Sequence, residues 1–294
     1  MPIRYVEPVY RPPSEAESLI LPLTDGCSWN RCTFCEMYTA PQKRFRARDE
    51  AEVLAGIRAL GERGADIRRV FLADGDALVL STRRLLAVLA AIREHLPQVR
   101  RVSSYCLPRN VRKKSVEELR ELADAGLKLV YVGAESGDDT VLVRVNKGET
   151  FASTEEALLK LGAAGMTRSV MILNGLGGQA FSAAHARHSA DLANAVQPEY
   201  LAVLVVSFPL GEARFRATFP EWEPLEIPGL LAEMAQFIDR LVLQRTVFRS
   251  DHASNWLSLR GNLPTDKETL LAQLRAAIAH PENAPLRPEW ARGL

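Results

Sequence analysis

Short apolar runs alternate with amphipathic helical patterns along most of the chain, and this alternation restricts the possible folds more than any other feature. Each predicted strand is followed by a helical pattern long enough to form a crossover connection to a parallel neighbour. Strand–helix repeats of this kind predict a parallel sheet and an α/β fold. We expect six such units in a row, with strands over residues 18–24, 69–73, 101–106, 128–133, 168–173 and 200–207.

Several of the predicted helices begin with a capping residue. Ser81 is suited to cap a helix that runs to His95, and Ser115 with Glu118 has the spacing of a capping box. The other helical patterns cover residues 49–62, 138–146, 153–164, 181–196, 228–244 and 266–279. We expect His185 and His188, both within residues 181–196, to face solvent and assign them no role.

Three of the four cysteines, Cys27, Cys32 and Cys35, lie within nine positions in the pattern C-x4-C-x2-C. Thiolates are soft ligands that favour iron–sulfur clusters or zinc. A closed structural zinc site needs four ligands, and no other Cys or His lies within twenty residues on either side. Three thiolates instead suit a four-iron cluster with one iron open to another ligand. The loop follows the first predicted strand, and α/β folds place their chemistry at such strand ends.

Composition places the chain among ordinary globular proteins and argues against several functional classes. It has 294 residues, with 47% hydrophobic and 25% charged residues and a net charge of +1. Such a balance argues against a nucleic-acid surface, and the basic runs at 43–48 and 109–114 are better explained by solvated faces or anion contacts. No apolar run is long enough for a membrane span or a secretory leader, so we expect a cytoplasmic protein.

The cysteine loop resembles that of the radical S-adenosylmethionine (radical SAM) superfamily, in which an aromatic residue commonly precedes the third cysteine, as Phe34 does here. This chain departs from the usual family spacing, because four residues instead of three separate the first two cysteines. The resemblance implies a [4Fe–4S] cluster on the three cysteines, with SAM chelating the fourth iron. It also implies a partial (β/α)6 TIM-type barrel over residues 18–211, after an extended N-terminal segment at 1–17.

Asp74, Gly75 and Asp76 follow the second predicted strand. In the family, a Gly-Gly-Glu sequence at this place receives the amino group of SAM through backbone carbonyls and sometimes through the acidic side chain. Two carboxylates at a strand end suit an ammonium group, although an ordinary Asp-Gly turn is the alternative explanation. The resemblance therefore assigns these three residues to SAM binding.

The stretch from Gly133 to Gly137 resembles the G-x-E-S-G sequence of radical SAM cores like those of the Elongator catalytic subunit and the tRNA methylthiotransferases. A carboxylate at Glu135 can accept hydrogen bonds from both ribose hydroxyls of SAM. Ser136 is also explained as part of a helix N-terminus. Asn174 and Gly175 begin a glycine-rich stretch after the fifth strand, where the family packs its backbone against adenine.

The remaining candidates concern the substrate. Tyr105 ends the third predicted strand, and the adjacent Cys106 is better explained as a small buried side chain than as a reactive thiol. His252 lies in the unusual segment 248–264 and is a candidate general acid or base. This segment belongs to a mainly helical C-terminal extension, residues 212–294, which we expect to cover the barrel mouth.

The resemblance thus implies a radical SAM enzyme that cleaves SAM reductively to a 5′-deoxyadenosyl radical, which abstracts hydrogen from a substrate. The family chemistry implies an external electron donor such as a flavodoxin or ferredoxin. Two alternatives remain: a non-catalytic zinc- or iron–sulfur-binding module, and an RNA-modifying radical SAM enzyme. The substrate, small molecule or other, is not identified by the sequence.

Overall fold

The predicted strands pair in parallel in the computed structural model, which describes residues 3–292. Parallel pairing joins β1 to β4, β4 to β5 and β5 to β6, and also joins β7 to β8 and β8 to β9. Only β10 runs antiparallel to its neighbour in this series. The bounds are β1 Leu19–Pro22, β4 Arg69–Ala73, β5 Arg101–Tyr105, β6 Leu127–Glu135, β7 Thr167–Asn174, β8 Tyr200–Val205, β9 Thr246–Arg249 and β10 Arg260–Leu263.

The chain divides into two compact units that exchange segments. The first unit comprises Met1–Asn30, Met37–Val132 and Ala157–Arg168, and the second comprises Arg31–Glu36, Gly133–Glu156 and Ser169–Leu294. In the first unit the strand order is β1-β4-β5-β6, and in the second it is β6-β7-β8-β9-β10. Strand β6 is shared, because its residues up to Val132 belong to the first unit and those from Gly133 to the second.

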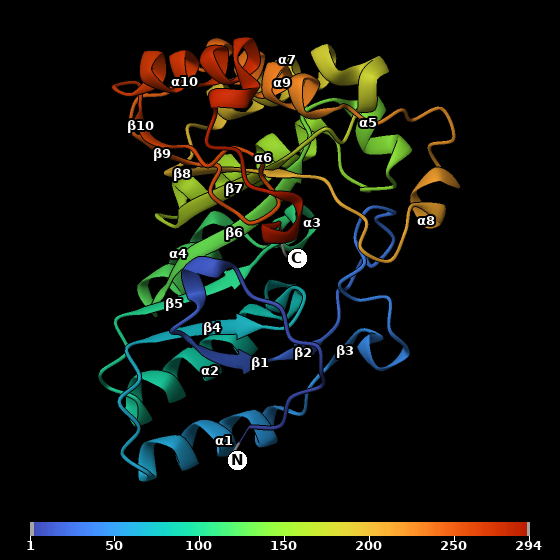
Figure 1. The fold of residues 1–294 in the computed structure, drawn as a ribbon. Coiled ribbons are helices and arrows are strands. Elements are labelled where there is room, and N and C mark those ends of the chain that lie inside the picture. The colour runs from blue at the N-terminus through green and yellow to red at the C-terminus, as the bar shows by residue number, and fades with distance from the viewer. Residues whose placement is uncertain (1–2, 293–294) are drawn as a thin grey trace. The chain divides into compact units, whose positions relative to one another are not determined.

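The first unit contains three helices with side-chain caps, two of which were predicted from the sequence. Asp49 accepts a hydrogen bond from the Glu52 amide at the start of α1 (Glu50–Glu62), and Ser81 caps α2 (Thr82–His95). At α4 (Val116–Asp124) both bonds of the Ser115–Glu118 capping box are present. Helices α1 and α2 pack side by side (Figure 1). The short helix α3 (Pro108–Val111) and the two-stranded ribbon of β2 (Thr24–Asp25) and β3 (Arg46–Ala47) were not predicted.

The second unit places three helices side by side, α7 (Gly178–Val196), α9 (Ile227–Arg240) and α10 (Lys267–Ala279), as Figure 1 shows. Two shorter helices also belong to it, α5 (Asp139–Arg144) and α8 (Ala213–Arg216). Helix α6 (Phe151–Ala163) runs from the second unit into the first. The α/β class predicted from the sequence is confirmed.

The sequence missed one parallel strand. Residues 248–264 were expected to return as a loop or short strand, with no place in the parallel sheet, but β9 pairs in parallel with β8 and β10 pairs with β9. Strand β9 is only four residues long and lacks a strong alternating pattern, so its sequence gave little indication of a strand. Because β9 is parallel to β8, the segment after Arg249 begins at the edge where the parallel strands end.

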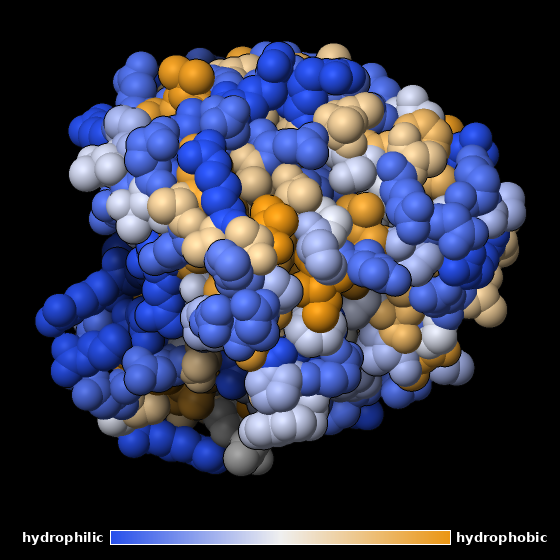
Figure 2. All heavy atoms as spheres, turned by 45° about the horizontal axis from the view of Figure 1, so that its top comes forward, coloured by the Kyte–Doolittle hydropathy of each residue, from blue (hydrophilic) through white to orange (hydrophobic). Residues whose placement is uncertain are grey.

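On the face shown in Figure 2, hydrophilic side chains make up most of the surface, and hydrophobic side chains lie in small groups between them. Within residues 3–292, no helix combines the length and the apolar character needed to cross a bilayer.

Within the first unit, the N-terminal segment is tied to the sheet by a buried carboxylate. Glu15, in a 3-10 turn at Pro13–Glu15, is fully buried. It accepts hydrogen bonds from the Tyr131 hydroxyl at 2.6 Å and from Arg101 at 2.8 Å. Burial and the Glu15 carboxylate together raise the pKa of Tyr131 well above its usual value. A buried carboxylate is stable only when it is paired in this way.

We predict that Glu15→Ala destabilises the protein by about 3–5 kcal/mol, because it leaves the buried partners of the carboxylate unpaired. Glu17→Ala is the matched control, since Glu17 is 86% exposed in its side chain and pairs with Arg69 at the surface. Its expected cost is below about 1 kcal/mol. Urea unfolding of both variants measures the difference, and equal costs would contradict the role given to Glu15.

Candidate active site

The predicted site residues fall at the carboxyl ends of parallel strands in both units. In the first unit, Cys27 lies beyond β1 and β2, Asp74 directly follows β4, and Tyr105 ends β5. In the second unit, Glu135 ends β6, Asn174 ends β7, and His252 lies after β9. Because neighbouring parallel strands end at the same edge, each unit gathers its own candidates at one edge of its strands.

The three cysteines of the loop are present as half-buried thiols, and they are divided between the units. Cys27 belongs to the first unit, whereas Cys32 and Cys35 belong to the second. The Cys35 amide donates to the Cys32 carbonyl at 3.3 Å, which closes a turn over the C-x2-C half. Among residues 3–292 no group of three or more His, Cys, Asp or Glu side chains is arranged to hold a single metal ion. The three cysteines are therefore a candidate donor set on the basis of their spacing and thiolate chemistry, which suit an iron–sulfur cluster.

In the first unit, the carboxylate of Asp76 organises the start of the cysteine loop. Asp76 is fully buried and accepts hydrogen bonds from the Ser28 amide at 2.8 Å and from the Ser28 hydroxyl. The Asn110 side chain donates a third bond at 3.0 Å. Burial raises the pKa of Asp76, and the bonds from Ser28 and Asn110 oppose that rise. The side chain thus already has partners within the protein, next to Cys27.

Asp74 is buried as well, and it forms an ion pair with Lys43, whose side chain is fully buried. Burial raises the pKa of Asp74, against the lowering effect of Lys43. Between the two carboxylates, Gly75 packs directly against the cysteine loop: a Cβ on Gly75 would lie 2.4 Å from the Gly26 carbonyl oxygen and 2.6 Å from the Cys27 Cα. Only glycine allows the two backbones to approach this closely.

In the second unit, the C-x2-C half of the loop is bound by α5 and by the C-terminal extension. The Thr33 amide donates to the Val145 carbonyl at 3.0 Å, and Arg214 of α8 donates to the Cys35 carbonyl. The Phe34 ring packs against a buried apolar cluster. That cluster consists of Val141, Val145, Leu176, Phe215, Phe219 and Trp222. The contact of α8 with the loop was not predicted, because no sequence pattern connects segments so far apart in the chain.

Glu135 forms an ion pair with Lys147 at 2.9 Å. Its φ angle is +66°, in the left-handed region that non-glycine residues seldom adopt. The Lys147 ammonium also lies 5.8 Å from the centre of the Phe34 ring, a cation–π distance. Strained backbone of this kind gathers at functional sites. Lys147 is therefore a further candidate site residue, identified by its contacts with Glu135 and Phe34 and not by a short sequence pattern.

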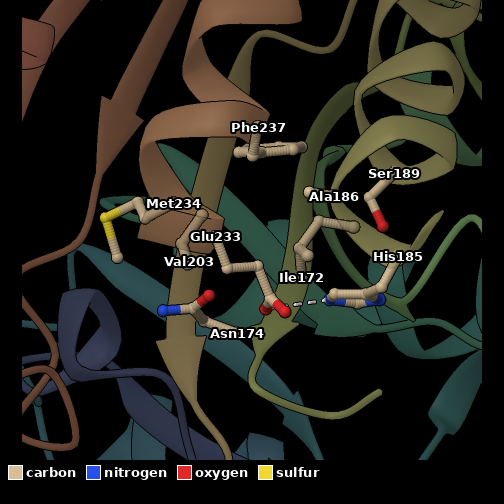
Figure 3. Close-up of a pocket in the computed structure, with 9 residues that line it drawn as sticks. All are labelled: Ile172, Asn174, His185, Ala186, Ser189, Val203, Glu233, Met234 and Phe237. Carbon is tan, nitrogen blue, oxygen red and sulfur yellow. Dashed lines mark ion pairs between the residues drawn. The ribbon is translucent and has the colours of Figure 1, made fainter. Parts of the chain in front are cut away.

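Ser136 and Gly175 each contact one of two buried residues of the second unit, His185 and Glu233, which Figure 3 shows side by side. The His185 Nδ1 atom lies 2.7 Å from the Ser136 hydroxyl, and Glu233 accepts a hydrogen bond from the Gly175 amide at 2.6 Å. The His185 Nε2 atom is 3.7 Å from the nearer Glu233 oxygen. The prediction that His185 faces solvent is wrong: it is 1% exposed, because the turn of α7 that carries it packs under α9. His188 is partly exposed and bonds Asp138 at 2.7 Å.

The segment after β9 holds His252 in a fixed orientation. Its Nδ1 atom accepts a hydrogen bond from the Ser254 amide at 3.1 Å and lies 2.9 Å from the Ser254 hydroxyl. Arg287 donates hydrogen bonds to the backbone carbonyls of Asp251 and His252. The C-terminal tail thus restrains the backbone of this segment. Burial lowers the pKa of His252, Arg287 lowers it further, and Asp251 acts in the opposite direction.

In the first unit, Tyr105 is half-buried in an aromatic group with Phe71 and Tyr131, whose ring centres lie 5.1 and 6.3 Å away. The neighbouring Cys106 is buried at 1% exposure, and its thiol contacts the Leu107 carbonyl. The sequence-based interpretation of Cys106 as a small buried side chain is confirmed.

The family model described as the radical SAM superfamily matches residues 21–186, more than half of the 294-residue chain. Solved structures with similar folds include coproporphyrinogen III oxidase (HemN) from Escherichia coli, at a TM-score of 0.57 and 15% identity. The radical SAM methyltransferase TsrM from Kitasatospora setae, solved with cobalamin and a [4Fe–4S] cluster, gives a TM-score of 0.51 and 23% identity. Elp3 from Methanocaldococcus infernus gives 0.50 and 12%.

These matches cover 76%, 63% and 80% of this chain, but only 52%, 36% and 56% of HemN, TsrM and Elp3 respectively. The chain therefore spans between about a third and just over half of the solved chains. No curated protein matches its sequence. At these identities the likeness shows the fold alone, and it confirms the predicted partial (β/α)6 barrel.

We predict that Gly75→Ala disrupts the packing of the cysteine loop, because its new Cβ would overlap backbone atoms that cannot rotate away. Gly64→Ala is the control: its φ is +64°, but a Cβ there meets no atom within 4 Å. We expect Gly64→Ala to cost about 1 kcal/mol from backbone strain alone. Gly75→Ala should cost about 1–3 kcal/mol more. Urea unfolding compares them, and equal losses would refute the close packing.

We predict a pH-dependent stability from His252. Because the pKa of His252 is lowered in the folded state, the unfolded chain binds more protons as pH falls below about 6.5, and stability decreases there. His252→Asn keeps an oxygen that can accept the Ser254 amide but cannot take up a proton. The wild type should therefore lose more stability than this variant between pH 8 and pH 5 in urea unfolding. Parallel pH curves for the two proteins would disprove the assignment.

Proposed function

The chain belongs to the radical SAM superfamily, and from this premise we propose that it is an enzyme in which Cys27, Cys32 and Cys35 hold a [4Fe–4S] cluster. Enzymes of this superfamily use such a cluster together with SAM. The observation that carries the proposal is the donor set: three thiols on one loop, whose two ends are bound by different elements. Bound cluster and SAM would supply a 5′-deoxyadenosyl radical by one-electron reductive cleavage of SAM to methionine.

The contacts around the loop give each half a separate support. Asp76 fixes the Ser28 backbone beside Cys27, and Arg214 and Val145 fix the segment that carries Cys32 and Cys35. A cluster ligand must be held in place without its thiolate being used elsewhere, and these bonds engage backbone atoms and neighbouring side chains. We propose that they define the positions of the thiolates before a cluster binds.

We propose that the same edges bind SAM. Asp74, Gly75 and Asp76 would receive its amino group through their backbone carbonyls, since both carboxylates are already paired inside the protein. Glu135 would accept the ribose hydroxyls, and the neighbouring Lys147 would offset its charge. Ser136, Asn174 and Gly175 would form the wall against the adenosine, with Phe34 beside the third cysteine.

We propose that the extension, residues 212–294, contributes residues that contact the substrate. Among them is His252, on a segment that Arg287 holds by hydrogen bonds. When its Nδ1 atom accepts the Ser254 amide, the Nε2 atom of neutral His252 carries the proton. In this tautomer the Nε2–H of His252 can donate a hydrogen bond to a substrate. Tyr105 offers a second hydroxyl in the first unit. We further propose an external one-electron donor such as a flavodoxin or ferredoxin, and a reducing compartment such as the cytoplasm.

We predict that anaerobic reconstitution with iron and sulfide gives a protein that forms 5′-deoxyadenosine from SAM and dithionite. Cys27→Ala, Cys32→Ala and Cys35→Ala should each lower this activity by at least about a hundredfold, because each removes one of three ligands. Cys106→Ala is the matched control and should keep both iron content and activity, since its thiol is buried and donates to the Leu107 carbonyl.

The iron and sulfide contents distinguish the outcomes. A colourless protein that binds zinc on the same thiols, with no nucleoside formed, would overturn the enzyme proposal in favour of a metal-stabilised binding module. RNA that co-purifies with an active protein would instead indicate the nucleic-acid-modifying alternative.

A further inference from the structure

Glu233 and His185 form a buried polar pair in the apolar interior between α7 and α9, with exposures of 2% and 1%. Apolar side chains surround them in Figure 3, including Ile172, Val203 and Phe237. Replacing such a pair by apolar side chains is often neutral or stabilising, so a buried polar pair is weak evidence for a purely structural role. The contacts of the pair are stronger evidence of its role, because Glu233 bonds the loop after β7 and His185 bonds the loop after β6.

Helix α9 fixes the loop after β7 through two bonds. The Glu233 carboxylate accepts the Gly175 amide at 2.6 Å, and the Asn174 side chain donates to the Leu230 carbonyl at 3.0 Å. The φ angle of Gly175 is +82°, and a Cβ there would lie 2.7 Å from a Leu230 methyl group. The orientation of the peptide between Asn174 and Gly175 is therefore set by α9, an element of the extension.

His185 fixes the loop after β6. The Ser136 hydroxyl oxygen already accepts the Asp138 amide at 2.9 Å, so its proton can be donated to the His185 Nδ1 atom at 2.7 Å. The Nε2 atom of that tautomer then carries the proton and faces Glu233 at 3.7 Å. Glu233, His185 and Ser136 thus lie in series between the two strand-end loops, with a hydrogen bond at the Ser136 end and a 3.7 Å approach between His185 and Glu233.

A small cavity lies beside the pair. Its volume is about 10 Å³, room for about one water molecule, and its polar lining comes from Asn174, His185, Ser189 and Glu233. The second Glu233 oxygen is buried without a hydrogen-bond partner among residues 3–292. A buried acceptor of this kind is costly unless it is satisfied. A water in this cavity would complete the connection between Glu233 and the residues around it.

We propose that His185 and Glu233 are positioning residues for SAM: they align the Ser136 and Gly175 loops and connect this alignment to helix α9 of the extension. The inference rests on the proposed function, because it takes these two loops to contact SAM. Neither residue touches the reacting atoms. Their effect is exerted on the direction of the Ser136 hydroxyl and of the Gly175 peptide, so it is expected in SAM affinity more than in turnover at saturating SAM.

Two near-isosteric variants of His185 test its contact with Ser136 and its approach to Glu233 separately, and two variants of Glu233 test the bond to Gly175. In His185→Asn the amide occupies the place of Nδ1 and can still bond Ser136, whereas in His185→Gln it reaches toward Glu233 and loses Ser136. Glu233→Gln keeps an oxygen that can accept the Gly175 amide, and Glu233→Ala removes it. Phe237→Leu is the matched control, since Phe237 lines the same cavity but takes no part in the bonds.

SAM binding is measured anaerobically on the reconstituted protein without reductant, and 5′-deoxyadenosine formation is measured at low and saturating SAM. Glu233→Ala and His185→Gln should weaken SAM binding by about tenfold, the effect of losing one buried hydrogen bond. His185→Asn and Glu233→Gln should recover most of that loss, and all variants should keep the cluster absorbance and the rate at saturating SAM.

The outcomes are separable. Wild-type protein that binds neither cluster nor SAM would refute the proposed function itself. Wild-type protein that binds SAM, with all four variants binding as tightly, would overturn the positioning role alone. An affinity loss in Phe237→Leu equal to that in Glu233→Ala at matched thermal stability would also overturn it, by showing that packing is responsible. If Glu233→Ala does not fold, the two His185 variants still decide the question.

Discussion

The carboxylate of Asp76 is the interaction on which the proposed cluster loop most depends. It is fully buried, and three hydrogen bonds from Ser28 and Asn110 compensate for its removal from water. Because Ser28 follows Cys27 directly, the end of β4 sets the position of the first cysteine. Gly75 makes the approach possible, since a side chain there would overlap the backbone of Gly26 and Cys27. The acidic residue after β4 thus supports the start of the cysteine loop, and the proposed contact with the SAM amino group is left to the backbone carbonyls around it.

The C-x2-C half of the loop depends on different contacts within its own unit. Thr33 bonds the end of α5, and Arg214 of α8 bonds Cys35. Phe34 joins an apolar cluster that includes Phe215 and Trp222 of the extension. The extension is therefore part of the support for the proposed cofactor site, in addition to its proposed contact with substrate. Helix α9 of the extension supports the loop after β7 in a similar way, because its Glu233 accepts a hydrogen bond from the Gly175 amide.

Buried charged groups recur at these positions, and each has a partner that explains its burial. Lys43 neutralises Asp74, Lys147 neutralises Glu135, and Arg101 with Tyr131 satisfies Glu15. A partial barrel of parallel strands has a mainly apolar interior, so each polar residue that a cofactor requires must be supported by others. This requirement explains why the residues that resemble the family are accompanied by lysines and histidines that no short sequence pattern includes.

The sequence by itself determined the strand–helix alternation, the capped starts of α2 and α4, and the three-cysteine loop, because periodicity, capping and ligand spacing are local properties of the chain. Strand β9 was missed, since four residues carry too little periodicity. The burial of His185, its partner Glu233 and the contact of Arg214 with Cys35 were decided only by the tertiary structure. These contacts join segments about 50 to 180 residues apart, and no spacing within one segment encodes which distant helix will pack against it.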